Sequence, residues 1–356
     1  MTSRITPQRI AEERIAVGVL GATGMVGQRF VELLDRHPLF QVAELAASDR
    51  SVGKRYGDAA PWRLDSEPLL QDRVVVACDP AAVRSRVVFS ALDKGAAQSI
   101  EAAFRDAGHL VISNAGAWRM DEAVPLLIPE VNPGHLDLIR GRRGAIVTNP
   151  NCTCIPLVVA LAPLHRAFGV EAVTCASYQA VSGAGYPGES AWDMLGNVHP
   201  HPGDEEEKVA EEPKKILGTL FGEGSGGTIE RASFPISARC VRVPVVDGHL
   251  IAAQIRLAGD PSPEDVKACL RDFQAPHVLP SSPRPLIRIA ERRDRPTPRT
   301  DAMAGNGMAI TVGRIERCEV MGVKLFALAH NAIRGAAGGA IANAELLHHL
   351  GLIEAG

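Results

Sequence analysis

The chain has 356 residues, which is more than one hydrophobic core usually accommodates, so we expect two domains. Apolar residues make up 46% of the chain and charged residues 22%, the balance of an ordinary globular protein. A formal net charge of −3 excludes a general attraction to nucleic acid or to an anionic membrane. The seven cysteines are scattered, without Cys-x-x-Cys pairs or zinc-ligand spacing, so we expect no metal site and a reducing, cytoplasmic location.

The first predicted element is a strand at 15–20, preceded by a polar stretch at 1–14 that we interpret as a flexible tail. The strand runs directly into Gly21-Ala-Thr-Gly-Met-Val-Gly27 and then into a helical pattern that continues to Arg36. Glycines at this spacing let the backbone approach a pyrophosphate at a helix N-terminus. An ordinary tight turn has a similar pattern, so the glycines need support from their surroundings.

That support comes from the rest of the first 151 residues. Further short apolar runs alternate with helix-compatible segments, at 40–47, 73–78, 87–92, 110–113 and 145–148. This βαβ rhythm is typical of a doubly wound parallel sheet. The sequence therefore predicts an α/β fold with a Rossmann dinucleotide-binding domain over 15–151.

The loop after the second strand would lie beside the adenosine ribose of a bound dinucleotide. It contains Ser48, Asp49, Arg50 and Lys54. An acidic residue at this point would accept a hydrogen bond from the 2′-hydroxyl of NAD, whereas hydroxyl and basic groups accommodate the 2′-phosphate of NADP. Only Asp49 favours NAD, and a solvated loop is the alternative for all of these residues. We therefore expect NADP.

A cysteine follows the last of these strands, in the stretch Thr148-Asn-Pro-Asn-Cys-Thr-Cys154, where an apolar helical pattern begins. We expect Cys152 to lie in the first turn of that helix, where free N–H groups and the helix dipole would favour its thiolate. The same N–H groups could stabilise an oxyanion. Cys152 is therefore a candidate nucleophile, and an inert core thiol is the alternative.

The segment 152–330 lacks the βαβ rhythm and is predicted to be an α+β domain. It contains a strand at 173–180, an acidic helix at 204–217 and a β-rich block at 234–257. The stretch 279–299 is rich in arginine, but it has no interleaved aromatic residues, so we interpret it as an inter-subunit or solvated loop and not as an RNA site. The segment 331–356 is predicted to be a small-residue helix that returns to the Rossmann domain.

Motifs in a fixed order extend over nearly the whole chain. They are Gly21-Ala-Thr-Gly-Met-Val-Gly27, Ser113-Asn-Ala-Gly-Ala-Trp-Arg-Met120, Asn149-Pro-Asn-Cys-Thr153, Ser182-Gly-Ala-Gly-Tyr-Pro-Gly188, Arg242-Val-Pro-Val-Val-Asp-Gly-His249 and His330-Asn-Ala-Ile-Arg-Gly-Ala-Ala-Gly338. The chain thereby resembles the aspartate-semialdehyde dehydrogenases, most of all their archaeal and fungal branch. The resemblance implies that 152–330 is a catalytic and dimerisation domain and that the protein is a homodimer or homotetramer.

The resemblance also implies a reaction. It is the NADPH-dependent conversion of L-aspartyl 4-phosphate to L-aspartate 4-semialdehyde and phosphate, a step toward lysine, methionine and threonine. Cys152 would be the nucleophile, His249 the general acid and base, and Gln179 the residue that orients the thioester. An imidazole that titrates near neutrality suits both proton transfers. Read alone, His249 fits a strand-end histidine with its hydrogen bonds satisfied better than a catalytic one.

The resemblance also implies substrate and cofactor roles. Arg242 would bind the α-carboxylate and Glu212 the α-amino group, while Lys215 and Arg119 would bind phosphate. Glu212 and Lys215 lie one helical turn apart, and without the resemblance a solvated helix face would explain them. Asn151 is also implied to contact the substrate. The cofactor-binding residues implied in addition to Ser48, Arg50 and Lys54 are Gly21, Thr23, Gly24, Met25, Val26, Ser90, Ser182, Gly183 and Asn331.

Other functions stay open at this point. The same scaffold could reduce malonyl-CoA, succinyl-CoA or N-acetyl-glutamyl phosphate. A nucleotide-binding sensor without turnover is an alternative of another class, which the presence of both Cys152 and His249 disfavours.

Overall fold

The computed structural model describes residues 14–222 and 226–353. Its first domain is built on a six-stranded sheet with the order β3-β2-β1-β4-β5-β6, and every pair is parallel. The strands are β1 (Ile15–Leu20), β2 (Phe40–Ala47), β3 (Val76–Ala77), β4 (Val87–Ser90), β5 (Leu110–Ser113) and β6 (Ala145–Thr148). This is the predicted Rossmann sheet, and its strand order reverses between β1 and β4, where dinucleotides bind in such folds.

The predicted strand at 73–78 is reduced to the two residues of β3 at the edge of the sheet. The helices and short helical turns of this domain are α2 (Met25–Asp35), α3 (Tyr56–Ala59), α4 (Lys94–Ala107) and η1 (Pro133–Ile139). Helix α2 buries Phe30, Val31 and Leu34 against the sheet. A Cβ on Gly27 would lie 2.3 Å from the carbonyl oxygen of Gly21, so only glycine lets this helix approach β1 so closely.

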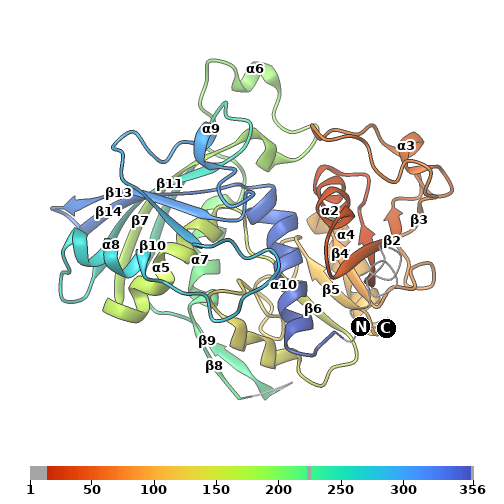
Figure 1. Ribbon diagram of the computed structural model, residues 1–356, viewed down its shortest axis with the longest axis horizontal. Coiled ribbons are helices and arrows are strands. Elements are labelled where there is room, and N and C mark those ends of the chain that lie inside the picture. Colours follow the sequence, from red (N-terminus) through yellow and green to blue (C-terminus); the bar gives the residue numbers. More distant parts are fainter. Residues whose placement is uncertain (1–13, 223–225, 354–356) are drawn as a thin grey trace, which may run out of the picture.

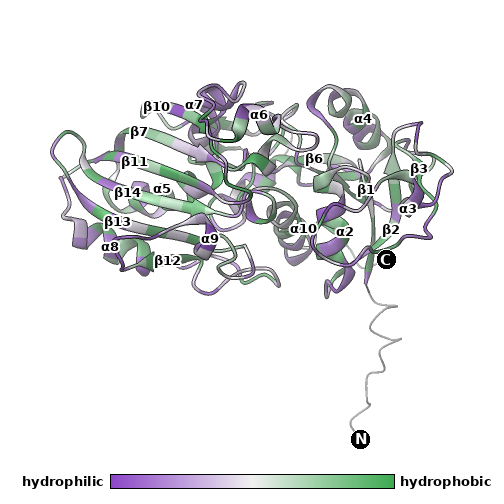
Figure 2. Cartoon of the chain, turned by 90° about the horizontal axis from the view of Figure 1, so that it is seen from above, coloured by the Kyte–Doolittle hydropathy of each residue, from purple (hydrophilic) through white to green (hydrophobic). Residues whose placement is uncertain are grey.

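The second domain contains a mixed six-stranded sheet with the order β10-β7-β11-β14-β13-β12. Its strands are β7 (Val170–Gln179), β10 (Ile236–Arg242), β11 (His249–Leu257), β12 (Ile287–Ala290), β13 (Ile310–Cys318) and β14 (Gly322–Ala329). Helices α5 (Cys154–Phe168), α7 (Glu205–Ile216) and α8 (Pro263–Arg271) lie beneath this sheet in Figure 1. The other face of β7, β11 and β14 is turned toward the viewer in Figure 2, where no helix of the described residues covers it.

Helix α5 is apolar on all sides because it forms the centre of the second core. Every residue from Cys154 to Leu164 is buried in it. The shorter elements of this domain are η2 (Val181–Ala184), α6 (Ala191–Met194), β8 (Thr219–Phe221), β9 (Thr228–Glu230) and α9 (Pro298–Asp301).

The chain then returns to the first domain through η4 (Ile333–Ala337) and α10 (Gly338–His349). Ala340, Ile341 and Leu347 of α10 belong to the hydrophobic cluster that also contains the residues of β1 and α2 (Figure 1). Arg334 in η4 donates to both carboxylate oxygens of Glu130, at 2.8 and 2.7 Å, and both side chains are buried. This bidentate pair fixes η4 between the two domains. In the described part of the chain, no helix has the length and apolar character needed to cross a membrane.

Candidate active site

A cavity of about 510 Å³ lies between the domains and contains the predicted nucleophile. Its walls come from the start of α2, the loop 182–185, η4 and the start of α7, with Cys152 among them. The first-domain part of the cavity lies at the switch point of the parallel sheet, so dinucleotide and substrate sites are adjacent.

Cys152 lies in a turn formed by its neighbour Asn151. The Asn151 side-chain oxygen accepts a hydrogen bond from the Thr153 N–H at 2.9 Å, and its carbonyl accepts one from the Cys154 N–H at 2.9 Å. Helix α5 begins at Cys154, so Cys152 precedes the helix and does not lie in its first turn as expected. On the other side, a Cβ on Gly335 would lie 2.6 Å from the Cys152 Cβ, which requires glycine where η4 passes the thiol.

The structure brings Cys152 and His249 together. The Sγ and Nε2 atoms are 3.3 Å apart, although the residues are 97 positions apart in the sequence. The Nδ1 atom of His249 accepts a hydrogen bond from the Ala180 N–H at 3.0 Å, so in the neutral ring the proton is on Nε2 and faces the sulfur. Burial, and then the charges of Arg242 and His330, lower the His249 pKa to about 3.

This finding corrects the expectation that His249 titrates near neutrality. Its ring stays neutral over the whole physiological range and presents an N–H to the thiol and to any oxygen bound beside it. The sequence could not show this, because the cause is the complete burial of the first residue of β11.

The surroundings of Cys152 disfavour its thiolate when no ligand is bound. Burial, and then the negative charge of Glu205, raise its pKa to about 12, while the cations Arg119, Arg242 and Lys208 oppose the shift. The expected activation by the helix terminus is therefore outweighed. Forming the thiolate requires a change in the charges around it.

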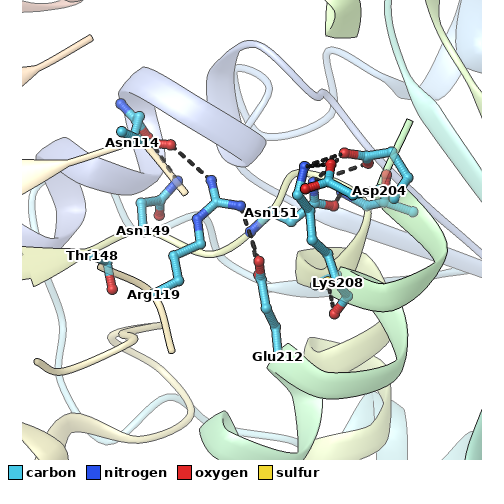
Figure 3. Close-up of polar contacts among 12 residues, drawn as sticks. Asn114, Arg119, Thr148, Asn149, Asn151, Asp204, Lys208 and Glu212 are labelled. Carbon is cyan, nitrogen blue, oxygen red and sulfur yellow. Dashed lines mark hydrogen bonds and ion pairs between the residues drawn. The ribbon is translucent and has the colours of Figure 1, made fainter. Parts of the chain in front are cut away.

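Glu205 and Lys208 in the first turn of α7 line the cavity, and sequence reasoning missed both. Glu205 accepts hydrogen bonds from the side chains of Asn151 at 3.1 and 3.0 Å, Gln179 at 3.3 Å and Lys208 at 2.9 Å. Lys208 also contacts Asp204 (Figure 3). The available signal was the pair Glu205 and Lys208, which has the same spacing as Glu212 and Lys215 and precedes it by two helical turns.

The structure does not place Lys215 at the cavity, which corrects its expected role in phosphate binding. Its Nζ donates to the backbone carbonyls of Arg119, Asp121 and Val124, at 2.7, 2.6 and 2.8 Å. An ammonium group has three hydrogens, so these carbonyls use all of them. Lys215 therefore attaches α7 to the segment 119–124, and burial lowers its pKa to about 8.

Glu212 is also turned away from the expected ammonium site. One carboxylate oxygen accepts a hydrogen bond from the Arg119 guanidinium at 3.0 Å and the other accepts one from the Asn151 N–H at 2.6 Å (Figure 3). Only 2% of Glu212 is exposed, so no room for a substrate ammonium remains beside it. Glu212 positions Arg119, which does line the cavity and also donates to the Asn114 carbonyl at 2.7 Å.

Arg242 lies beneath the loop 182–185, next to His249. A Cβ on Gly183 would lie 2.8 Å from one Arg242 nitrogen and 2.9 Å from the His249 Nε2. Arg242 donates to the Ala180 carbonyl at 3.1 Å, and its buried Nε has no partner in the described part of the chain. The Gln179 side-chain oxygen is likewise buried and without a partner among the described residues. Neither residue is among those that line the cavity, and both keep free hydrogen-bonding capacity beneath its surface.

The residues predicted to bind the cofactor fall into separate groups. Met25, Val26, Ser182, Gly183 and Asn331 line the cavity. The last of these donates to the Ser182 hydroxyl at 2.8 Å and so links the C-terminal segment to the loop 182–185. Ser90 is fully buried at the end of β4 and does not line the cavity, contrary to a direct role in binding.

The start of α2 fits a dinucleotide pyrophosphate. Gly21 has a φ of +72°, which favours glycine, and Gly24 precedes the first residue of α2. The N-terminal end of α2 has no side-chain cap, and its first turn has no acidic residue. Its free N–H groups therefore remain available for an anion. Thr23 lies in the same glycine turn.

The loop after β2 carries the other predicted cofactor contacts. Ser48, Arg50 and Lys54 are exposed there and do not line the cavity. Among the described residues, no group of three or more His, Cys, Asp or Glu side chains could hold a metal ion.

Comparison with known proteins agrees with this geometry. The family model for the semialdehyde dehydrogenase NAD-binding domain matches residues 16–139, and the model for the semialdehyde dehydrogenase dimerisation domain matches 161–334. The aspartate-semialdehyde dehydrogenase of Archaeoglobus fulgidus is 49% identical over 342 residues, covering 94% of this chain and 98% of the relative. That of Methanothermobacter thermautotrophicus is 44% identical over 350 residues, covering 94% and 99%.

Among solved structures, the aspartate-semialdehyde dehydrogenase of Candida albicans with NADP superposes with a TM-score of 0.89 at 39% identity, covering 96% of this chain and 100% of that one. Because archaeal and fungal relatives match over nearly their full lengths, the chain belongs to the aspartate-semialdehyde dehydrogenase family.

Proposed function

We propose that the protein is an NADP-dependent aspartate-semialdehyde dehydrogenase that forms L-aspartate 4-semialdehyde from L-aspartyl 4-phosphate through a thioester on Cys152. The observation that carries the proposal is the 3.3 Å contact between the buried His249 and Cys152, which lines a cavity with acidic and basic side chains. A thiol beside a neutral imidazole that donates toward it suits covalent acyl chemistry.

The charges around the thiol fit an amino-acid substrate. Arg242 has an unpartnered buried nitrogen and is suited to the α-carboxylate, while Glu205 is suited to the α-ammonium group. Arg119 and Lys208 line the same cavity and are suited to the phosphate. In this proposal, Glu205 and Lys208 take the roles that the sequence suggested for Glu212 and Lys215.

The substrate itself would activate the nucleophile. Glu205 is the charged group that most raises the Cys152 pKa, after burial. An α-ammonium group bound to Glu205 would offset its negative charge, which lowers the thiol pKa when the acyl phosphate is in place. Cys152 would release its proton to solvent in the cavity, and the thiolate, which accepts the hydrogen bond of the His249 Nε2–H, would attack the acyl carbon. The C–O bond to phosphate would then break, and Arg119 and Lys208 would stabilise the departing phosphate.

The second half of the reaction uses His249. NADPH bound at the start of α2 would supply the hydride that reduces the thioester. The His249 Nε2–H would donate a hydrogen bond to the oxygen on which negative charge develops and would keep its proton. The C–S bond would then break and release the aldehyde and the Cys152 thiolate. The Ala180 N–H keeps Nδ1 as an acceptor and so holds the ring in this orientation.

The proposed cofactor preference is NADP over NAD. Ser48, Arg50 and Lys54 are exposed in the loop after β2 and can surround a 2′-phosphate. The Candida albicans structure, which was solved with NADP, supports this choice.

A homodimer is proposed through the uncovered face of the second sheet. Tyr178 on β7 is 40% exposed and pairs with Leu250 on β11, while Ala252 on β11 pairs with Phe326 on β14. Apolar side chains on neighbouring strands form a surface suited to a second copy of the same sheet. The match to a dimerisation domain supports this placement.

The decisive assay measures NADPH formation from L-aspartate 4-semialdehyde, NADP and phosphate. We expect activity that saturates with phosphate. Parallel assays with malonyl-CoA, succinyl-CoA and N-acetyl-glutamyl phosphate should give little turnover, because none of these substrates carries the ammonium group that offsets Glu205. Turnover of one of them, without phosphate-dependent activity on the semialdehyde, would refute the proposed substrate. The proposed roles of Cys152 and His249 would then still hold.

A further inference from the structure

A second cavity, of about 370 Å³, lies against η4 and shares that wall with the catalytic cavity. Ile333 and Gly338 line the second cavity, whereas Ala332, Gly335 and Ala336 line the catalytic one. The remaining walls come from the C-terminal half of α2, from α10 and from the loops 280–284 and 305–308. A volume of this size is at the lower end of the range of small-molecule sites.

The lining of this cavity combines an apolar side with polar groups, which are His37, Ser281, Ser282, Arg284 and Asn306. Leu33, Met308, Ile333 and Ile341 supply apolar side chains. Arg284 lines the cavity, is exposed, and has no ion pair or hydrogen bond with any residue of the described ranges. The Ser281 hydroxyl is buried and has no partner among the same residues. Together, a guanidinium and a hydroxyl donor suit a carboxylate.

The cavity offers no comparable group for an ammonium ion. No carboxylate is among its lining residues within the described chain. Glu345 lies next to it but is only 1% exposed, and it accepts from the His37 Nε2–H at 2.7 Å and from the Ser281 N–H at 3.1 Å. Its hydrogen bonds are thus made within the protein, so an amino acid would leave its ammonium group without a counter-charge.

We propose that this cavity binds a small organic monoanion with an apolar body, of the medium-chain aliphatic carboxylate type. The carboxylate binds Arg284 and the Ser281 hydroxyl, and the aliphatic chain packs on Leu33, Ile333 and Ile341. An occupant in contact with Ile333 restrains η4, whose Gly335 packs directly on Cys152. Occupancy is thereby linked to the mobility of the wall behind the nucleophile, whatever substrate the enzyme uses.

The test uses the full chain saturated with NADP and three matched probes: octanoate, octanamide and 2-aminooctanoate. Calorimetry should show saturable octanoate binding that is at least tenfold tighter than that of either other probe, because the amide lacks the charge and the amino acid adds an unpaired ammonium. Arg284→Ala should weaken octanoate about tenfold and leave octanamide unchanged. Arg288→Ala is the matched control, since Arg288 is also exposed and lies outside the cavity.

Hydrogen exchange locates the site independently of calorimetry. Octanoate should slow exchange in 331–341 and 280–284 of the native protein, and should not do so in Arg284→Ala. Leu33→Trp, which fills the cavity, should abolish both effects. Absence of saturable octanoate binding, equal effects of Arg284→Ala and Arg288→Ala, or protection confined to the segments around Arg242 would each overturn the proposal. None of these readouts uses dehydrogenase activity, so the proposal can fail while the proposed function holds.

Discussion

The side-chain amide of Asn151 donates to both carboxylate oxygens of Glu205, so the residue before the nucleophile positions the carboxylate that raises the thiol pKa. The same carboxylate accepts hydrogen bonds from the side chains of Gln179, at the end of β7, and of Lys208, which lies on α7 like Glu205 itself. One group thus sets the resting state of Cys152 and offers a counter-charge to the substrate. In a low-dielectric cavity, these two roles are coupled.

Glu205→Gln should separate these roles. Removing the negative charge lowers the Cys152 pKa, so alkylation by iodoacetamide at pH 8 should be at least several-fold faster than in the native protein. The same change should raise KM for the semialdehyde about tenfold or more, because the substrate ammonium loses its partner. Glu207→Gln is the control, since Glu207 is exposed on the same helix and does not line the cavity. Slower alkylation in Glu205→Gln would contradict the charge argument.

Cys152→Ser should abolish turnover while NADP binding, measured by fluorescence quenching or calorimetry, remains within about twofold. An alcohol cannot supply a nucleophile of comparable strength here, and the start of α2 is unaffected by the change. Cys269→Ser, at a half-buried cysteine on α8, should retain full activity. Residual activity above a few per cent in Cys152→Ser would rule out the nucleophile assignment.

The buried, neutral His249 predicts a pH dependence of stability. Its pKa is near 3 in the folded chain and near 6.5 in an unfolded one, so below pH 6.5 the unfolded state binds the additional proton. The free energy of unfolding therefore falls as the pH falls, and His249 alone accounts for about 2 kcal/mol of the loss between pH 7 and pH 5. Urea denaturation of His249→Asn at both pH values should show a correspondingly smaller loss.

His249 should also affect the rate of the reaction. His249→Asn should reduce kcat about a hundredfold or more with little change in KM, because its hydrogen bond strengthens as negative charge develops. In the native protein, kcat/KM should not fall through a titration of His249 near pH 6.5, because the ring is already neutral there. The pH profiles of the native protein and of His249→Asn should therefore have the same shape in this range. An effect on KM alone would contradict the proposed role.

Local sequence patterns predicted much of the fold. The parallel strands are short apolar runs, the glycine turn fixes the entry to α2, and Cys152 lies four residues after the end of β6. The site was harder to predict from the sequence, because the chemistry of its side chains depends on how deeply each is buried. Glu205 and Glu212 are seven residues apart on one face of α7, and only the packing of segment 119–124 over the later turn decides which one reaches the cavity.

Cofactor discrimination can be tested in the loop after β2. Ser48→Asp should weaken NADP binding by about 1–3 kcal/mol, because it replaces a hydroxyl donor with a charge that repels the 2′-phosphate. NAD binding should be unchanged or slightly improved. Comparing kcat/KM for the two cofactors in the native protein and in Ser48→Asp measures the shift. Equal efficiency with NAD and NADP in the native protein would show that Asp49 determines the preference.

Two lysines on α7 distinguish a substrate contact from a structural one. Lys208→Met should raise KM for phosphate at least tenfold with little loss of stability, because Lys208 lines the cavity and its ion pairs within the described residues are with Asp204 and Glu205 at the start of α7. Lys215→Met should leave KM for phosphate nearly unchanged and destabilise the fold by about 3 kcal/mol, since the carbonyls of Arg119, Asp121 and Val124 lose their donor. Phosphate-dependent kinetics and urea denaturation of both variants measure the two effects. If Lys215→Met instead impaired phosphate use without destabilising the chain, α7 would have to move Lys215 into the cavity during turnover.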